Sequence, residues 1–159
     1  MNIFAYDPSP FNCAMWLDDK RKNKMILETA QLLCGAIRFN MGPEWVDNTG
    51  LSCYRTTHVN HPCAKWTRAS IANYSWLTVY YNVLLNQWGK PHGCDAVSPI
   101  IHRAMVEMEH PNQKLTPFVN CTTYKQLPVH EAYRLYHSDK WSIECPTWNK
   151  GVEPSWRKH

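Results

Sequence analysis

The chain has 159 residues, a formal net charge of +4 at pH 7 and a pI of about 8.7. This length suits one domain with its own hydrophobic core, and the mild positive charge permits a nucleic-acid partner without requiring one. No apolar run approaches the roughly 18 residues of a membrane span, and the first residues lack the features of a secretory signal. We therefore expect one monomeric, cytoplasmic domain that does not bind membranes.

The first ten residues, MNIFAYDPSP, end in a turn rich in Pro, Asp and Ser and predict an extended arm. From about Asn12 to Phe39 the pattern is helical, with Asn12 or Asp19 as the N-cap. The apolar stripe of this helix recurs at three- and four-residue steps and consists of Ile26, Ala30, Leu33 and Ile37. The opposite, polar stripe consists of Arg21, Lys24, Glu28, Gln31 and Gly35.

The segment from Asn40 to Asn60 is rich in Gly, Pro, Asn and Thr, which predicts a loop. A long aromatic helix follows, because Pro62 suits its first turn and Gly89 suits its end. Two further helices are predicted, over Ala96 to Met108 and over Val129 to about Trp141. We predict an all-α fold, a single compact helical domain with an extended N-terminal arm.

The seven cysteines are odd in number and scattered, and no two have the C-x-x-C spacing of common zinc and redox sites. We expect reduced thiols, mostly buried as small apolar groups. A mixed Cys/His zinc site is the alternative. The main prediction is that the protein uses no metal and no other cofactor.

The polar stripe around Glu28 allows two interpretations. Charged side chains opposite an apolar stripe are what any surface helix shows. Alternatively, a DNA backbone lies along Arg21, Lys22 and Lys24. A carboxylate among these cations repels phosphate, so it adds nothing to a surface that only binds. On a surface that performs chemistry, Glu28 would act as a general base or stabilise developing positive charge.

The segment THVNHP and the helix after it carry further candidate contacts. His58 and His61 could cap the helix, touch the substrate or bind a metal. Lys65 and Arg68 lie on the first turns of the helix and could face DNA. The Trp and Tyr residues that continue to Trp88 are predicted as core, because they recur at helical spacing.

The C-terminal tail interleaves aromatic and basic residues. Trp148, Lys150 and Arg157 suit stacking on bases combined with phosphate contacts. The alternative is a tail docked onto the body of the protein by Trp148 and Trp156.

Four short segments, taken in order, resemble the pyrimidine-dimer DNA glycosylase family, the endonuclease V type known from phages. Asp19 to Glu28 is an acidic residue followed nine positions later by a glutamate, and NHP at Asn60 to Pro62 begins a long helix. A glycine and a turn end that helix at Gly89 to Gly93, and PTWNK lies near the C-terminus at Pro146 to Lys150. Together these segments cover most of the chain in the order of the family.

The resemblance implies a helical fold and an activity on double-stranded DNA. Members of this family use the α-amino group of the N-terminal residue to displace a damaged base, and an imine with the sugar then permits strand cleavage. The amine corresponds to Met1, or to Asn2 if Met1 is removed, and an assisting glutamate corresponds to Glu28. The expected function is a DNA glycosylase with AP lyase activity on damaged or modified pyrimidines, encoded by a virus and acting in the infected cell. The candidate DNA contacts are Arg21, Lys24, Gln31, Arg55, His58, His61, Lys65, Arg68, Trp148, Lys150 and Arg157.

Three positions depart from the family pattern. Arg21 replaces a histidine, Leu27 replaces the arginine before the glutamate, and Gln31 replaces an arginine three residues after it. Because the large residue Asn2 disfavours removal of the initiator, we expect Met1 to remain. These departures favour a lesion or modified base other than the pyrimidine dimer. They also leave two alternatives, a non-catalytic DNA-binding or host-interaction protein and a viral enzyme that modifies a DNA base.

Overall fold

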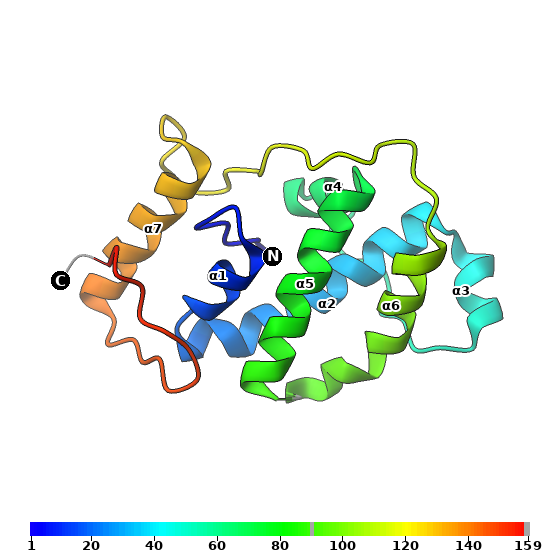
Figure 1. The fold of residues 1–159 in the computed structure, drawn as a ribbon, viewed down its shortest axis with the longest axis horizontal. Coiled ribbons are helices and arrows are strands. Elements are labelled where there is room, and N and C mark those ends of the chain that lie inside the picture. Colours follow the sequence, from blue (N-terminus) through cyan, green and yellow to red (C-terminus); the bar gives the residue numbers. More distant parts are fainter. Residues whose placement is uncertain (90, 158–159) are drawn as a thin grey trace.

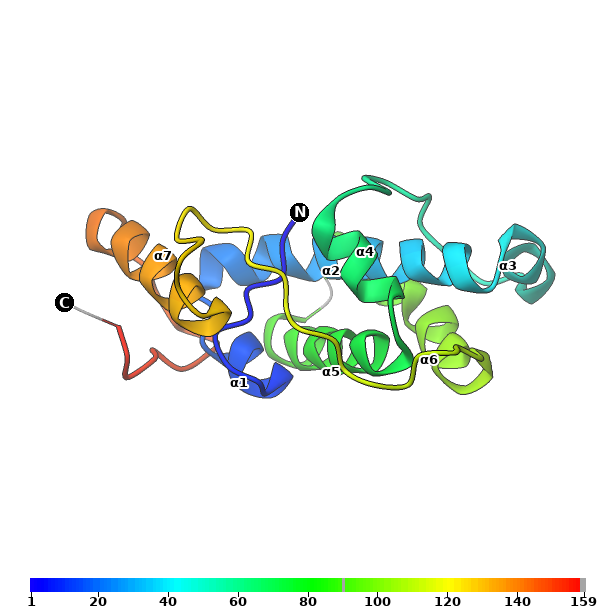
Figure 2. The same ribbon diagram turned by 90° about the horizontal axis from the view of Figure 1, so that it is seen from above.

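Helix α2 (Asp19–Asn40) is the axis on which most other elements pack, as Figures 1 and 2 show. The computed structural model describes residues 1–89 and 91–157, and these residues form seven α-helices, one 3-10 helix and no strand. The other elements are α1 (Pro10–Met15), α3 (Pro43–Thr49), α4 (Pro62–Arg68), α5 (Ile71–Trp88), the 3-10 helix η1 (Pro91–Val97), α6 (Ser98–Glu107) and α7 (Val129–Ile143). The predicted all-α fold with an extended arm is confirmed. No helix in the described part of the chain is long and apolar enough to cross a membrane.

The first predicted helix is two helices, α1 and α2. The N-cap of α2 is Asp18, whose Oδ1 accepts a hydrogen bond from the backbone N–H of Arg21 at 3.1 Å. The predicted caps, Asn12 and Asp19, were therefore wrong, because the cap that interrupts the helical pattern is one residue earlier than Asp19. The predicted apolar stripe of α2 is fully buried.

The second predicted helix is also two helices, α4 and α5. Ser70 is the N-cap of α5, and its Oγ accepts a hydrogen bond from the N–H of Asn73 at 3.0 Å. Pro62 occupies the first turn of α4, and Gly89 ends α5 with a φ of 88°, as the sequence predicted. The prediction that the aromatic run is core is confirmed for most of its large residues, since α5 buries Tyr74, Trp76, Tyr80 and Tyr81.

The predicted loop from Asn40 to Asn60 contains the short helix α3. Gly42 and Gly50 flank it with φ angles of 85° and 64°, a region of backbone space that glycine adopts at little cost. The third predicted helix is shorter than expected, since α6 begins at Ser98 after η1. All seven cysteines are free thiols, and four of them are buried.

The N-terminal arm, residues 1–9, lies beside α7 (Figure 2). Ile3 and Tyr6 of the arm are buried. Trp76 of α5 donates a hydrogen bond to the carbonyl of Pro8 at 2.7 Å, and Arg134 of α7 donates one to the carbonyl of Tyr6 at 2.8 Å. The arm therefore forms the layer through which α7 attaches to the other helices.

The C-terminal tail, residues 144–157, is fastened to the first turn of α2. The carboxylate of Asp19 accepts hydrogen bonds from the backbone and side-chain amides of Asn149, both at 2.9 Å. Trp148 donates from its indole nitrogen to a backbone carbonyl, and Trp156 packs among aromatic rings. The docked tail that the sequence offered as an alternative is therefore what the structure contains.

Candidate active site

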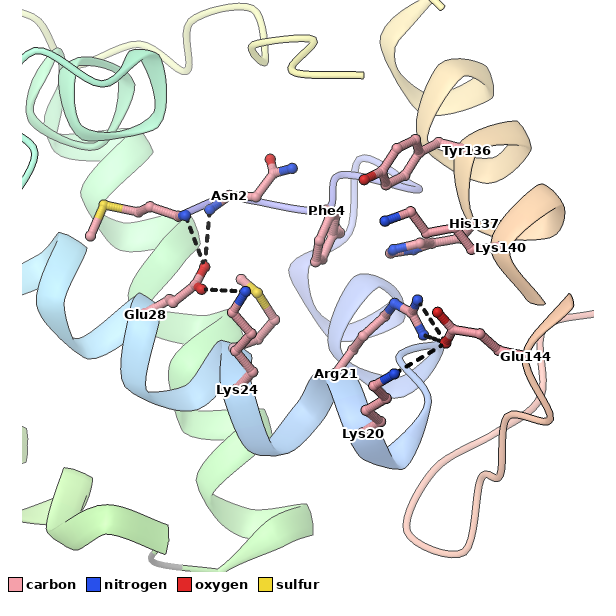
Figure 3. Close-up of a pocket in the computed structure, with 12 residues that line it drawn as sticks. Asn2, Phe4, Lys20, Arg21, Lys24, Glu28, Tyr136, His137, Lys140 and Glu144 are labelled. Atoms are coloured by element: carbon pink, nitrogen blue, oxygen red, sulfur yellow. Dashed lines mark hydrogen bonds and ion pairs between the residues drawn. The ribbon is translucent and has the colours of Figure 1, made fainter. Parts of the chain in front are cut away.

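A cavity of about 350 Å³ lies where the N-terminal arm meets α2 and α7 (Figure 3). Its size falls within the range of small-molecule sites, about 300–1,000 Å³. The arm contributes Met1, Asn2 and Phe4; α2 contributes Lys20, Arg21, Lys24, Met25 and Glu28; α7 and the residue after it contribute Tyr136, His137, Lys140 and Glu144. The three residues that the sequence named as catalytic thus line one cavity with two of the named DNA contacts.

Glu28 lies at the centre of the contacts on the α2 side of the cavity. Its Oε2 lies 3.6 Å from the amino nitrogen of Met1 and accepts a hydrogen bond from the backbone N–H of Asn2 at 3.1 Å. Its Oε1 faces Lys24 Nζ at 3.2 Å, and the side chain is 13% exposed. Gln31 lies about one turn further along α2 and is half-buried. The carboxylate therefore faces two amines and remains accessible.

The arm holds the Met1 amino group in place by contacts of its own. Oδ1 of Asn2 accepts hydrogen bonds from the backbone N–H of Ile3 at 2.8 Å and from the hydroxyl of Tyr133 at 2.9 Å. Ile3 is buried in the core. These contacts lie beside the Asn2 N–H that bonds to Glu28. Packing of Ile3 and the hydrogen bonds of Asn2 therefore fix the position of the Met1 amino group independently of its ion pair with Glu28.

Arg21 is paired with carboxylates within the protein. Its Nη1 lies 2.8 Å from Oδ2 of Asp18 and 3.1 Å from Oε2 of Glu144. Burial opposes the charged guanidinium, but the hydrogen bonds with Glu144 and Asp18 outweigh it and raise the pKa of Arg21. The same hydrogen bond from Arg21 is the main cause that lowers the pKa of Glu144. Arg21 lines the cavity, but carboxylates neutralise much of its charge, so it is a weaker phosphate partner than the sequence predicted.

The prediction that Lys22 faces DNA is wrong. Lys22 is 0% exposed, and its Nζ donates hydrogen bonds to the backbone carbonyls of Met15 at 3.2 Å and Lys150 at 3.1 Å. Burial lowers the pKa of Lys22 to about 8, although the nearby carboxylate of Asp19 opposes this. Gly151 approaches so closely that a Cβ at that position would overlap the ammonium group. Lys22 therefore fastens the C-terminal tail to α2.

The α7 side of the cavity is mainly aromatic. The ring of His137 lies 4.4 Å from that of Phe4 and 5.1 Å from that of Trp141, measured between centroids. The ammonium group of Lys140 lies 4.6 Å from the centroid of the Tyr136 ring. Flat rings on the α7 wall and cations on both walls suit a ligand that has both a flat part and an anionic part.

A second group of predicted contacts lies on α4 and the loop before it. This group consists of Arg55, His58, His61, Lys65 and Arg68. His61 is the N-cap of α4, and its Nδ1 accepts a hydrogen bond from the N–H of Cys63 at 3.1 Å, as one sequence interpretation expected. Burial lowers the pKa of His61, and the positive charge of the N-terminal amine lowers it further. Arg55, His58 and Lys65 are exposed. Arg68 donates to the carbonyl of Val59 at 2.9 Å and so stabilises the loop.

A third group of predicted contacts lies in the tail. The indole of Trp148 donates to the carbonyl of Trp16 at 3.0 Å, so stacking on a base would require release of this bond. Arg157 donates to Glu153 at 2.6 Å and lies over the ring of Trp148. Lys150 is exposed, with its Nζ 4.9 Å from the ring centroid of Trp88. None of these three side chains lines the cavity between the arm and α7, and their DNA contacts stay predictions.

The α7 wall of the cavity was not predicted from the sequence. Tyr136, Lys140 and Glu144 recur at four-residue steps, a spacing that marks one face of a helix, and His137 lies beside them. That spacing could have identified the wall. Phe4 gave no such signal, because an extended arm has no periodicity that says which side chain faces a cavity.

Within the described part of the chain, no group of three or more His, Cys, Asp or Glu side chains could hold a metal ion. Comparison of the chain with protein-family profiles, with curated proteins and with solved structures found no match. The geometry of the cavity is therefore the main basis for assigning a function.

Proposed function

We propose that the protein is a DNA glycosylase with AP lyase activity that acts on damaged or modified pyrimidines in double-stranded DNA. The observation that carries this proposal is the contact between the amino group of Met1 and Glu28, 3.6 Å apart on the wall of the cavity. A positioned amine and a carboxylate that can accept its proton are the pair that imine chemistry on a sugar requires. The sequence resemblance to pyrimidine-dimer DNA glycosylases supports the same assignment.

Glu28 activates the amine by accepting a proton. Attack on a sugar carbon needs a neutral amine, so the Met1 ammonium group has to lose a proton first. The distance of 3.6 Å exceeds a hydrogen bond, and catalytic contacts of this kind often tighten only in the reacting complex. If Met1 is removed, the nitrogen of Asn2 becomes the amine, and it already lies 3.1 Å from the same oxygen. The carboxylate is therefore in place for either N-terminal residue.

The neutral nitrogen then bonds to C1′ of the nucleotide while the bond from C1′ to the base breaks. The base leaves with the electron pair and takes a proton from the attacking nitrogen. Glu28 returns its proton to the ring oxygen as the sugar opens, which leaves an iminium between the nitrogen and C1′. Glu28 next accepts a proton from C2′, and the 3′ phosphate leaves with the electrons of its C–O bond. Water hydrolyses the imine and releases the amine.

The rim of the cavity favours a polyanion. Lys24 is 74% exposed, and Lys20 and Lys140 are exposed beside it. Phosphate contacts supply most of the affinity of proteins for DNA, so exposed cations around the cavity would hold the backbone while one nucleotide enters. Arg55 on the loop before α4 and Lys65 on α4 are also exposed and are further candidate phosphate contacts.

The test is covalent trapping with borohydride. Untagged protein is incubated with duplexes that carry an abasic site or a pyrimidine dimer, with undamaged duplex as the control. Borohydride reduces the imine to a stable amine, so we expect a covalent protein–DNA species on the abasic duplex. Acetylation of the N-terminus should abolish it. Absence of the species on the abasic duplex would exclude the lyase mechanism.

Two further outcomes would identify the alternatives. Salt-sensitive binding without cleavage of any lesion would indicate a non-catalytic DNA-binding protein. A base that is chemically altered but still attached to its sugar would indicate a base-modifying enzyme.

A further inference from the structure

The imidazole of His137 contains a buried polar atom without a partner. His137 is 1% exposed and lines the cavity, and its Nε2 has no hydrogen-bond partner among the residues that the structure describes. Buried polar atoms are nearly always paired, so an unpaired one needs an explanation. Figure 3 shows His137 on α7 facing Phe4 and the α2 side of the cavity. A ligand in the cavity supplies that explanation.

The hydrogen bond with Tyr6 determines which nitrogen of His137 carries the proton. The hydroxyl of Tyr6 contacts Nδ1, and burial raises the pKa of Tyr6 well above its usual range, so the phenol keeps its proton. Burial also lowers the pKa of His137, so the imidazole is neutral. If Nδ1 donated to Tyr6, the phenol hydrogen would lack an acceptor among the described residues. Donation from Tyr6 to Nδ1 satisfies both groups and leaves the proton of the imidazole on Nε2.

The position of the imidazole is fixed by its neighbours. Trp141 stacks on it with an interplanar angle of 24°, and Phe4 of the arm lies across it at 57°. The indole of Trp141 is itself held, because it donates to the buried carboxylate of Asp18 at 2.8 Å. The donor on Nε2 is therefore positioned before any ligand binds, which is the condition for selective recognition.

We propose that His137 reads the base of a pyrimidine nucleotide in this cavity, with Nε2–H donating a hydrogen bond to a carbonyl oxygen of the base. This inference rests on the proposed function, because it takes the cavity as the nucleotide site. Phe4 is the lid in this arrangement, since its ring lies against the imidazole and also lines the cavity. A base that enters displaces the ring of Phe4 and takes its place beside His137.

The chemistry of the walls selects the ligand class. A neutral imidazole that offers one N–H requires an acceptor, and thymine, uracil and cytosine all present a carbonyl oxygen at O2. Adenine has no carbonyl group, and guanine presents its carbonyl oxygen at O6 and not at O2, so the donor by itself excludes only adenine. The flat ring of Tyr136 suits stacking, and the exposed ammonium groups of Lys20, Lys24 and Lys140 suit a phosphate. A cavity of about 350 Å³ is near the lower end for ligand sites, so it fits one nucleotide better than a dimer.

The test compares carbonyl groups on a free nucleotide. Wild-type protein is titrated with thymidine 5′-monophosphate and with its 2-thio and 4-thio analogues, and amide chemical shifts report binding by NMR. Because sulfur is a weak acceptor, we expect one of the two analogues to bind about tenfold more weakly than the parent. Equal binding of all three, or no binding of the parent at millimolar concentration, would overturn the inference without any variant.

Two variants identify His137 as the source of the discrimination. His137→Asn keeps a polar atom near Nδ1 but loses the donor at Nε2, so we expect it to bind all three nucleotides equally. His137→Gln restores a donor with the reach of Nε2 and should restore part of the preference. Discrimination that persists unchanged in His137→Asn would show that another residue reads the base.

A negative result in the nucleotide titration does not imply a negative result in the borohydride trapping, and the reverse also holds. An adduct on an abasic duplex requires no base, so it reports the amine alone. Discrimination between oxygen and sulfur on a free nucleotide requires no chemistry, so it reports base recognition alone.

Discussion

Two carboxylates on α2, Asp19 in its first turn and Glu28 in its third, differ in their hydrogen-bond donors. Asp19 accepts from the hydroxyl of Thr147 at 2.8 Å and from two amide groups of Asn149, both at 2.9 Å. Glu28 accepts from one backbone amide and faces two amines, those of Met1 and Lys24. Both side chains accept hydrogen bonds from fixed donors, but only Glu28 also faces amines that can exchange protons with it.

This difference distinguishes a structural carboxylate from the carboxylate that we propose to be catalytic. Burial opposes ionisation of Asp19, but its hydrogen bonds from the tail outweigh burial and lower its pKa. Those donors belong to Thr147 and Asn149 of the docked tail, and Asp19 does not line the cavity. The amines at Glu28 lie on a cavity, where a substrate can replace one contact and react with another. We therefore expect substitutions of Asp19 to change stability and substitutions of Glu28 to change chemistry.

The largest effect should follow Glu28→Gln. The amide cannot accept a proton from the amine, so turnover on a cleavable lesion should fall by at least about 100-fold. The free energy of unfolding in urea should change little, because the amide still accepts the hydrogen bond from Asn2. Glu44→Gln, which alters an exposed glutamate on α3, is the matched control and should retain full turnover. Normal turnover of Glu28→Gln would remove this residue from the mechanism.

Asp19→Asn should show the opposite pattern. The amide oxygen accepts fewer and weaker hydrogen bonds and the amide nitrogen has no acceptor in the tail, so the free energy of unfolding should fall by about 2 kcal/mol. Urea titration followed by tryptophan fluorescence measures this loss. The yield of trapped adduct per folded molecule should equal that of the wild type. A large loss of adduct in a fully folded variant would contradict the division between the two carboxylates.

Stability should fall as the pH is lowered through the range in which histidine titrates. Burial lowers the pKa of His137 well below 6.5, and the positive charges of Arg21 and Lys140 lower it further. Below pH 6.5 the unfolded chain binds a proton that the folded chain does not, so this group reduces stability by up to about 1.4 kcal/mol per pH unit. Above pH 6.5 both states are neutral, and the contribution is constant.

Urea midpoints at pH 7.5 and 5.5 measure this slope. The pKa of His61 is lowered as well, so the part due to His137 is the difference between wild type and His137→Gln. An equal slope in the two proteins would show that His137 is protonated as easily in the folded chain as in the unfolded chain.

The smallest effect should follow Lys24→Gln. Lys24 is exposed on the rim, so we expect the free energy of unfolding of the Lys24→Gln protein to differ from that of the wild type by less than about 0.5 kcal/mol. The logarithm of DNA affinity falls linearly with the logarithm of salt concentration. Loss of one phosphate contact should reduce the magnitude of that slope by about 1. Lys114→Gln is the control, because Lys114 is exposed and lies outside the cavity. Identical slopes for the two variants would place Lys24 outside the DNA interface.

Local sequence patterns predicted the part of the fold that depends on periodicity and turn chemistry. The buried stripe of α2, the first turn at Pro62 and the end at Gly89 all follow from residues close in sequence. The breaks before α2 and α5 were missed, because each depends on one polar cap, Asp18 or Ser70, within a longer apolar pattern. A single capping residue is a weaker sequence signal than an apolar stripe that continues over many helical turns.

The candidate site was predicted only on its α2 side and at the N-terminus. Glu28 and Met1 came from the ordered motifs, and the structure places them in contact. The α7 wall and the burial of Lys22 depend on contacts between segments more than 100 residues apart, such as that between Lys22 and Lys150. The four-residue spacing marks one face of α7 but not the segment that this face meets. No local pattern encodes the contact of Lys22 with Lys150, so a lysine next to the polar stripe was taken for a surface residue.

The most direct measurement is to identify the atom that carries the trapped DNA. The adduct reduced with borohydride on an abasic duplex is digested, and peptide mass spectrometry locates the modified amine. The cavity contains the amino group of Met1 together with the ammonium groups of Lys20, Lys24 and Lys140, so the result distinguishes among them. We predict modification of the N-terminal amine, on Met1 or on Asn2 if Met1 has been removed. Modification of a lysine side chain, with the N-terminal peptide intact, would contradict the assignment of the amine beside Glu28 as the nucleophile.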